Sequence, residues 1–309
     1  MIELRRILCP VDFSDATPHA VRPAISLATE YGAELYLVHI LDFPHPHLDA
    51  LGPSYDVMPY YKEMEDEATR RLDELVDDEA RKFAETHVSI RKGAPFLEIL
   101  NMASEEKIDL IVMPTRGRTG VDRFLFGSVA EKIVRMAACP VLTIAPRDGA
   151  PQPFTPKRIL HPTDFSDYSD CALPYAVSFA GRYNAELIMM HVVTLWDYDP
   201  ANPEWRFPPL PQEHKEAAEV AAQKALDIHG GPGVPATLKV DRRLVRGFDP
   251  SVEIVQVSED SNVDLIVMAT HGRTGLKHAL MGSTAEKVTR FAECPVLTIK
   301  HPEHESVLP

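Results

Sequence analysis

Residues Val263 to Ser283 read VDLIVMATHGRTGLKHALMGS, a short apolar run followed by a glycine-containing loop and the start of a helix. The run from Leu265 to Met268 is too short and too uniformly apolar for a surface helix, so it indicates a strand buried on both faces. Gly272 gives the loop conformational freedom, and Gly282 precedes a helix that we expect at 284–291. A helix that begins beside such a loop presents unpaired amides at the positive end of its dipole, which favours a bound phosphate.

The same arrangement occurs twice in the chain. The sequence IDLIVMPTRGRTG from Ile108 to Gly120, followed by Gly127 and Ser128, repeats it at an offset of 155 (282 − 127). Nearer the N-terminus, Ile7 to Asp15 matches Ile159 to Asp167 at an offset of 152 (159 − 7). The chain is therefore two copies of one domain. The second copy has a net insertion of three residues (155 − 152), between its predicted second and fourth strands.

Each copy alternates apolar strands with amphipathic helices, which predicts an α/β fold: a five-stranded parallel sheet with helices on both faces. In the first copy we expect strands at 6–11, 35–40, 88–91 and 140–144, besides the strand before the glycine loop, and helices at 18–30, 61–85 and 96–105. Thr17 is the expected N-cap of the first helix, and the second copy has a predicted long helix at 213–228. Ligands of such sheets bind beyond the carboxyl ends of the strands, where Asp12 would adjoin the glycine loop.

The repeat also predicts the domain boundaries. We expect a first domain at 1–146, a proline-rich linker at 147–156, a second domain at 157–300 and a tail at 301–309. The predicted last strands, 140–144 and 295–299, are apolar and end each domain, so we expect the two domains to pack through them as a homodimer would. Further pairing of whole chains stays open.

Composition restricts the class of protein. The chain has 309 residues, 45% apolar and 25% charged, which suits two globular domains of ordinary size. It has no apolar run near the ~20 residues of a membrane span and no signal peptide, so we expect a cytoplasmic protein without membrane partners. The four cysteines form no C-x-x-C pair, and a net charge of −14 disfavours nucleic acid as a partner. His45 and His47 are a possible metal pair, but exposed loop histidines are the more ordinary interpretation.

The glycine loops resemble those of a known family, the universal stress proteins. Its ATP-binding branch has the pattern glycine, two residues, glycine, nine residues, glycine, then serine or threonine. Both copies keep the last two glycines and the serine, but Pro114 and Ala269 replace the first glycine. Over nearly its whole length the chain resembles a tandem member of this family, which implies two flavodoxin-like domains of the HUP type.

The resemblance also implies a set of nucleotide contacts. The phosphates would lie against the loop and the helix start, the nucleoside beside an aspartate, and the adenine against the end of the second strand. The residues at these positions are Gly117, Gly127, Ser128, Gly272, Gly282 and Ser283 for the phosphates, Asp12 and Asp164 for the nucleoside, and Ile40 and Val192 for the adenine. Ala269, at the position of the first glycine, would keep its amide for ribose or phosphate. The expected ligand is ATP, or ADP or AMP, with Mg²⁺ because the aspartate otherwise adds negative charge beside a polyphosphate.

Several of these residues have a second interpretation that needs no ligand. Ser128 precedes Glu131 by three residues, as in a capping box, and so does Ser283 relative to Glu286. The two aspartates could equally cap the turn into the first helix. Pro114 lacks an amide donor whereas Ala269 keeps one, so the second site is expected to bind nucleotide more tightly.

Three functions fit these features. The first is a stress-response module that binds ATP and changes its contacts with an unknown protein partner. The second is a slow ATPase, which requires a group that orients water at the γ-phosphate, and no such residue can be selected from the sequence. The third is an interaction scaffold of the same fold that binds no nucleotide.

Overall fold

The computed structural model describes residues 2–42, 58–75, 84–116, 126–146, 149–194, 211–272 and 281–301. The chain divides into two compact units, one from Glu3 to Phe154 and one that begins at Thr155 and includes Ile2. The amide of Ile2 donates a hydrogen bond to Oγ of Ser178, 2.8 Å away, which ties the N-terminal end to the second unit. We call these units the first half and the second half.

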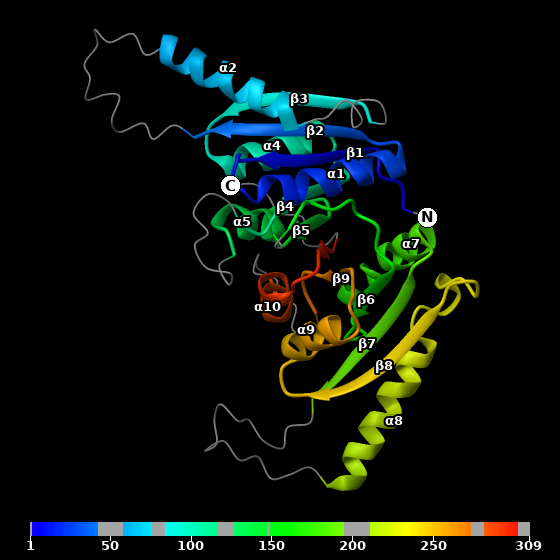
Figure 1. The fold of residues 1–309 in the computed structure, drawn as a ribbon. Coiled ribbons are helices and arrows are strands. Elements are labelled where there is room, and N and C mark those ends of the chain that lie inside the picture. The colour runs from blue at the N-terminus through cyan, green and yellow to red at the C-terminus, as the bar shows by residue number, and fades with distance from the viewer. Residues whose placement is uncertain are drawn as a thin grey trace, which may run out of the picture. The chain divides into compact units, whose positions relative to one another are not determined.

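The first half is a parallel sheet with the strand order β3-β2-β1-β4-β5 (Figure 1). Its elements are β1 (Arg6–Val11), α1 (Thr17–Tyr31), β2 (Glu34–Leu41), α2 (Met58–Leu75), β3 (Thr86–Lys92), α4 (Pro95–Glu105), β4 (Leu110–Pro114), α5 (Ser128–Met136) and β5 (Val141–Ile144). Right-handed crossovers place α1 and α2 on one face of this sheet and α4 and α5 on the other.

The second half repeats this plan with the strand order β10-β9-β6-β7-β8. Its elements are β6 (Arg158–Pro162), α6 (Asp167–Asp170), α7 (Leu173–Tyr183), β7 (Glu186–Thr194), α8 (Gln212–Ile228), η3 (Gly231–Gly233), β8 (Val240–Gly247), α9 (Pro250–Asp260), β9 (Leu265–Ala269), α10 (Ser283–Phe291) and β10 (Val296–Ile299). The predicted fold class, tandem parallel α/β domains of five strands each, is confirmed.

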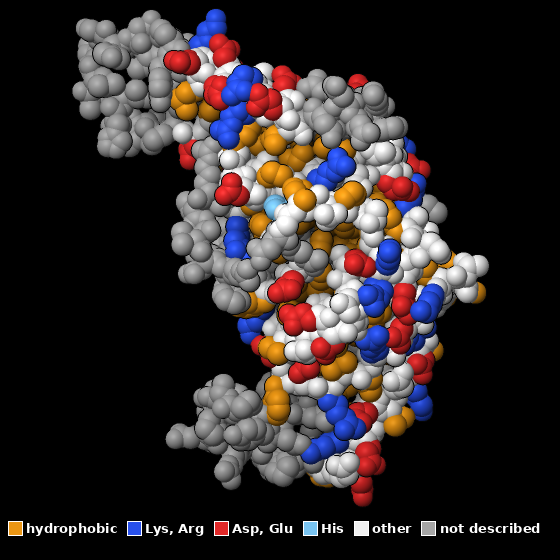
Figure 2. All heavy atoms as spheres, viewed as in Figure 1, with side chains coloured by type: hydrophobic (Ala, Val, Ile, Leu, Met, Phe, Trp, Pro, Cys, Tyr) orange, Lys and Arg blue, Asp and Glu red, His pale blue; other side chains and the backbone are white. Residues whose placement is uncertain are grey.

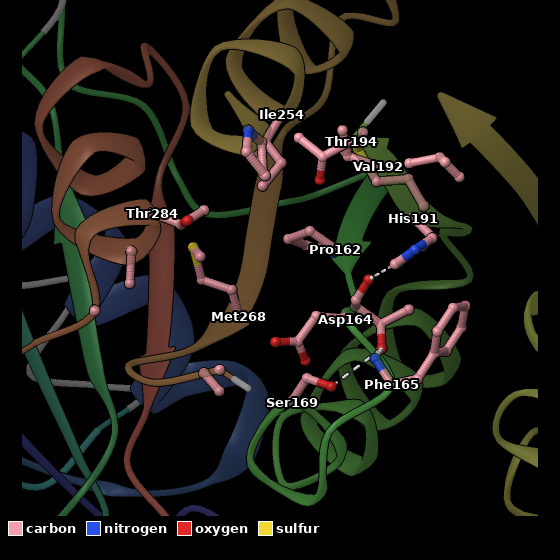
Figure 3. A pocket seen from close by; sticks show the side chains of 18 of the residues that line it. Pro162, Asp164, Phe165, Ser169, His191, Val192, Thr194, Ile254, Met268 and Thr284 are labelled. Carbon is pink, nitrogen blue, oxygen red and sulfur yellow. Dashed lines mark hydrogen bonds between the residues drawn. The ribbon is translucent and has the colours of Figure 1, made fainter. Parts of the chain in front are cut away.

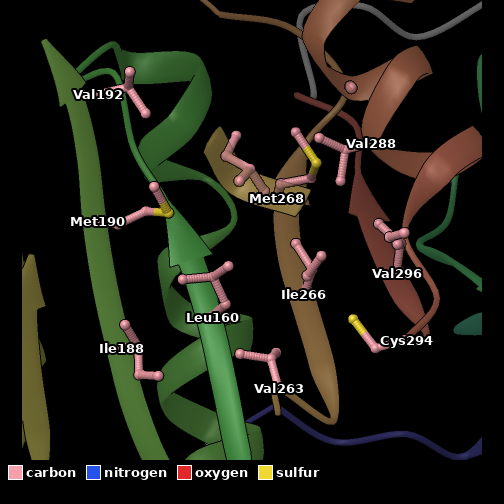
Figure 4. Close-up of a cluster of buried hydrophobic side chains, with 13 residues drawn as sticks. Leu160, Ile188, Met190, Val192, Val263, Ile266, Met268, Val288, Cys294 and Val296 are labelled. Atoms are coloured by element: carbon pink, nitrogen blue, oxygen red, sulfur yellow. The ribbon is translucent and has the colours of Figure 1, made fainter. Parts of the chain in front are cut away.

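One part of the core of the second half lies between the sheet and the helices α9 and α10. All five residues of β9 are buried, as predicted for a strand covered on both faces. Figure 4 shows the inward side chains of neighbouring strands packed together. The cluster consists of Leu160, Ile188, Met190, Val192, Ile254, Val263, Ile266, Met268, Ala285, Val288, Ala292, Cys294 and Val296.

The structure corrects two predictions in the first half. The helix expected at 61–85 has different bounds: α2 is described from Met58 to Leu75, residues 76–83 lie outside the described part, and Ala84 and Glu85 are not helical. The strand predicted at 88–91 is part of β3, which starts at Thr86 and pairs with β2. Thr17 is not the N-cap of α1: Ala16 has that position, and the hydroxyl of Thr17 donates to Asp12 Oδ1 at 2.9 Å.

The surface carries charges of both signs. On the face shown in Figure 2, Lys and Arg side chains alternate with Asp and Glu, and the described residues of that face form no continuous basic patch. Among the described residues, no helix has the length and apolar character needed to cross a bilayer.

Candidate functional site

A cavity of about 940 Å³ opens at the carboxyl ends of the strands of the second half. Its wall is formed by the ends of β6, β7 and β9, the first turn of α10, one face of α8, and the turn before α9. Figure 3 shows Asp164 between two sides of this cavity, with Met268 and Thr284 on one side and Phe165 and His191 on the other. The cavity therefore lies where the α/β topology predicts a ligand site.

One end of the cavity is lined by backbone amides. Helix α10 begins at Ser283, and Gly282 is its N-cap. The amide of Gly282 donates to the carbonyl of Thr270 at 2.8 Å, which fixes the helix against the end of β9. The amides of Ser283 and Thr284 belong to the first helical turn, which cannot satisfy them internally, and both residues line the cavity. This end is suited to an anion.

The first half has the same backbone arrangement. Gly127 is the N-cap of α5, Ser128 is its first residue, and the amide of Gly127 donates to the carbonyl of Thr115 at 2.8 Å. The capping-box interpretation of Ser128 and Ser283 is therefore wrong, because a glycine holds the cap position in both helices. Of the other predicted loop residues, Gly117 and the segments 118–125 and 273–280 lie outside the described residues, as do His45 and His47.

The aspartate at the end of the first strand is held by its own turn. In the second half, Oδ1 of Asp164 accepts from the amide of Ser166 at 3.1 Å and from its hydroxyl at 2.5 Å. Oδ2 of Asp164 lies so close to Gly272 that a Cβ atom at residue 272 would overlap it. The turn-capping role is thus present in the structure, and it fixes a carboxylate in the wall of the cavity.

In the first half Asp12 has the corresponding bonds. Its Oδ1 accepts from the amide of Ser14 at 3.0 Å, from the hydroxyl of Ser14 at 2.7 Å, and from Thr17. The carboxylates of both halves are therefore oriented in the same way, by hydroxyl and amide donors that follow them in the chain.

The residue after each aspartate has an unusual backbone. Phe13 has φ 59° and Phe165 has φ 60°, in the left-handed region that costs L-residues about 1–2 kcal/mol. The ring of Phe165 packs on that of His191 with centroids 4.3 Å apart, and Phe13 packs on His39 at 4.4 Å. Sequence reasoning missed these aromatic pairs, although Asp-Phe-Ser and a histidine in the second strand recur in both copies.

The two histidines are held in one tautomer. Nδ1 of His191 lies 2.7 Å from the carbonyl oxygen of Thr163, and Nδ1 of His39 lies 2.6 Å from that of Val11. Because a carbonyl only accepts, Nδ1 carries the proton in each ring. The Phe–His pair thus connects the strained turn to the end of the second strand.

Another part of the cavity wall is apolar. Val192, Ile254 and Met268 line it and belong to the buried cluster of the second half. Ile40 occupies the position of Val192 on β2 and is also nearly buried. Ala269 lines the cavity at the end of β9. The predicted residues Asp164, Val192, Ala269, Gly272, Gly282 and Ser283 therefore surround one cavity.

Behind Phe165 the second half contains a buried pair of histidines. The ring of His161 on β6 is fully buried and stacks parallel to His229, with centroids 6.0 Å apart. Burial lowers the pKa of His161 to about 4. The counterpart in the first half is Cys9, and burial raises the pKa of its thiol to about 12. The buried side chain at this position is therefore an imidazole in the second half and a thiol in the first.

The residues described here include no group of three or more His, Cys, Asp or Glu side chains arranged to hold a metal ion. One carboxylate, Asp164, lines the cavity. A divalent cation at this place would therefore depend on oxygen atoms of a ligand for most of its coordination, as Mg²⁺ does beside nucleotide phosphates.

Comparison with known proteins gives consistent results for both halves. The profile of the universal stress protein family matches residues 3–145 and 155–300. A universal stress protein of Mycolicibacterium smegmatis is 26% identical over 304 residues, 95% of this chain and 96% of that protein. A universal stress protein of Methanocaldococcus jannaschii, MJ0531, is 36% identical over 141 residues, 45% of this chain and 81% of its own length.

A solved structure has the same fold over the whole chain. The crystal structure of a universal stress protein from Archaeoglobus fulgidus superposes with a TM-score of 0.69 at 22% identity, covering 97% of this chain and 99% of the other.

Proposed function

Because the chain belongs to the universal stress protein family, we propose that it is a regulatory protein of the stress response that binds ATP, or ADP or AMP, in the cavity of its second half. Occupancy of this cavity would change the contacts of the chain with a protein partner. We place this activity in the cytoplasm, where the four free cysteines of the chain would stay reduced.

The observation that carries the proposal is the arrangement of polar and apolar groups in the cavity wall. The start of α10, at Ser283 and Thr284, suits phosphate groups, and the apolar part of the wall at Val192 and Ile254 suits a planar base. Asp164 also lines the cavity and offers an acceptor for ribose hydroxyls. A nucleotide has a group that suits each of these three parts of the wall.

Mg²⁺ fits this arrangement as a partner of the phosphates. The carboxylate of Asp164 is held at the cavity by Ser166, so it supplies one oxygen ligand without rearrangement. When bound, the cation would neutralise part of the charge on the phosphates. It would also offset repulsion between the phosphates and Asp164.

We propose weaker binding in the first half. Gly127 and Ser128 have the backbone arrangement of their counterparts, but β4 ends in Pro114 where β9 ends in Ala269. The proline has no amide to donate to a phosphate or ribose oxygen. A hydrogen bond to a charged acceptor contributes about 1.5–3 kcal/mol, so the loss of one donor lowers affinity about tenfold or more.

Dedicated catalysis is not part of the proposal. Hydrolysis of ATP needs a group that orients water for attack on the γ-phosphate. In the described residues of the cavity, the side chains with that chemistry are Asp164, which its turn already holds, and two histidines, His191 and His271. A slow ATPase is the alternative, and a scaffold without nucleotide is the second alternative.

Titration calorimetry on nucleotide-free full-length chain tests the proposal. We expect saturable heat with ATP, and loss of the tighter site in Gly282→Val, because a side chain there approaches the carbonyl of Thr270 and blocks the ligand. Gly233→Val is the matched control, since a Cβ at that position meets open space. If the wild type gives no heat and mass spectrometry finds no co-purified nucleotide, the scaffold is the correct interpretation.

A further inference from the structure

The walls of the two sites differ on the helix that follows the second strand. Helix α2 and helix α8 can be aligned through the sheet: Thr86 and Val240 pair with equivalent residues of β2 and β7, at an offset of 154 (240 − 86). Leu72 and Leu226 are both fully buried and have the same offset of 154 (226 − 72). The two helices therefore lie in the same register relative to their sheets.

This register shows which residues face each site. In α8, four alanines line the cavity: Ala218, Ala221, Ala222 and Ala225. At an offset of 154 their counterparts in α2 are Met64, Glu67, Ala68 and Arg71. Three of the four positions thus carry a large or charged side chain in the first half and a methyl group in the second.

The position of Arg71 confirms the alignment in space. Its guanidinium carbon lies 4.2 Å above the ring of Phe13, the phenylalanine of the strained turn. In the second half, Ala225 lines the same cavity as Phe165, the counterpart of Phe13. The position that carries this guanidinium in the first half therefore carries a methyl group in the cavity wall of the second.

The second half also has one additional aromatic residue at this wall. The turn before α4 is Gly93, Ala94, Pro95, and the turn before α9 is Gly247, Phe248, Asp249, Pro250. Because Ala94 and Asp249 are both N-cap residues, Phe248 is the inserted one. Its side chain lines the cavity and is 47% exposed, which is costly for a phenylalanine without a partner.

We propose that the second half takes a nucleotide whose ribose carries a neutral apolar or aromatic group, and that the α8 alanines and Phe248 form the subsite for that group. The inference rests on the proposed function, since it uses the phosphate end at α10 to orient the ligand. With the phosphates there, the ribose lies at Asp164. The next residue, Phe165, lines the same cavity as the four alanines of α8. A group on a ribose hydroxyl enters this space, which has no charged side chain among its described lining residues besides Asp164.

The probe for this subsite is ATP esterified on its 2′ or 3′ hydroxyl with an N-methylanthraniloyl group, a neutral fluorescent aromatic. We expect the full chain to bind it on the order of tenfold more tightly than ATP, with increased fluorescence as the group leaves water. Ala225→Arg copies the first half and should lower the affinity for the probe relative to the affinity for ATP, both measured on the same variant. Ala217→Arg is the matched control, because Ala217 lies on the same helix and is exposed outside the cavity.

Two further variants make the test independent of any single substitution. Phe248→Ala removes an exposed ring and should reduce the advantage of the probe without affecting folding. Arg71→Ala in the first half, combined with Gly282→Val to silence the second site, should give the first site an increased preference for the probe.

The outcomes separate the inference from the proposed function. If ATP binds but the probe binds no better, or if Ala225→Arg and Ala217→Arg lower probe binding equally, the subsite is wrong and the nucleotide site stands. If neither ATP nor the probe binds, the proposed function is wrong and the subsite with it.

Discussion

Replacement of Gly272 by alanine tests how the aspartate is held in the site. The backbone at Gly272 does not need a positive φ, so alanine is acceptable there except for its Cβ, which would overlap Oδ2 of Asp164. The carboxylate would have to turn away from Gly272, and this movement pulls Oδ1 from the amide and hydroxyl of Ser166.

The expected magnitude follows from these two bonds. A hydrogen bond to a charged acceptor contributes about 1.5–3 kcal/mol, so the loss of one corresponds to about a ten- to hundredfold decrease in ATP affinity if the displaced carboxylate no longer meets the ribose. Titration calorimetry measures this decrease. Urea unfolding of the ligand-free chain gives a second readout, because the transition of the second half should shift to lower urea concentration.

A double-mutant cycle isolates the cause. In an Asp164→Ala background the added Cβ has no carboxylate to displace, so Gly272→Ala should be nearly neutral there. Gly233→Ala, where a Cβ meets open space, controls for the general effect of replacing a glycine. An equal cost of Gly272→Ala in both backgrounds would refute the reasoning, and so would wild-type behaviour of the single variant.

Four further predictions follow from the site and the repeat. Gly282→Val should abolish the tighter of two ATP-binding phases in calorimetry, and Gly127→Val should abolish the weaker one, because Pro114 removes a donor from the first site. If Gly127→Val abolished the tighter phase instead, the proline would matter little. EDTA should weaken ATP binding, and equal affinities with Mg²⁺ and with EDTA would exclude the cation. Burial lowers the pKa of His161 from 6.5 to about 4. Below pH 6.5 the unfolded chain therefore binds a proton at this residue that the folded chain binds only near pH 4. The free energy of unfolding should thus decrease as the pH falls from 6.5 to 4, by up to about 3 kcal/mol. His161→Cys places a cysteine where the first half has Cys9, and it should make the free energy of unfolding, measured with urea, depend less on pH. An unchanged pH dependence would assign the effect to other groups. Separately expressed halves should associate in sedimentation experiments through the apolar last strand of each, whereas monomeric halves as stable as the whole chain would contradict that pairing.

Much of the fold was predictable because its signals are local and occur twice. The apolar runs that became β4 and β9 are too short for helices, and their repetition at a fixed offset fixed the domain plan. The end of α2 was not predictable in this way. Its charged continuation has good helix propensity, and only pairing with β2 determines that β3 begins at Thr86.

Six residues proposed from the sequence line the cavity of the second half, but the geometry of its wall was less predictable. The glycine and serine pattern indicated the helix start, yet Ser128 could be read as a cap as easily as a first helical residue, since the two positions differ by one residue. The left-handed backbone of Phe165 has no sequence signal, because phenylalanine disfavours that conformation. The contrast between Arg71 and Ala225 became visible only when burial and strand pairing fixed the register of the two helices.

The strained turn at Phe165 has a consequence for rates. A bulky residue stays left-handed only where its surroundings over-determine it, and here the His191 ring and the two bonds of Ser166 to Asp164 do so before any ligand arrives. An arriving nucleotide therefore meets a carboxylate that is already oriented and does not wait for the turn to rearrange. The association rate constant should then be similar for wild type and for wall variants such as Phe248→Ala. Their differences in affinity should arise from different dissociation rate constants.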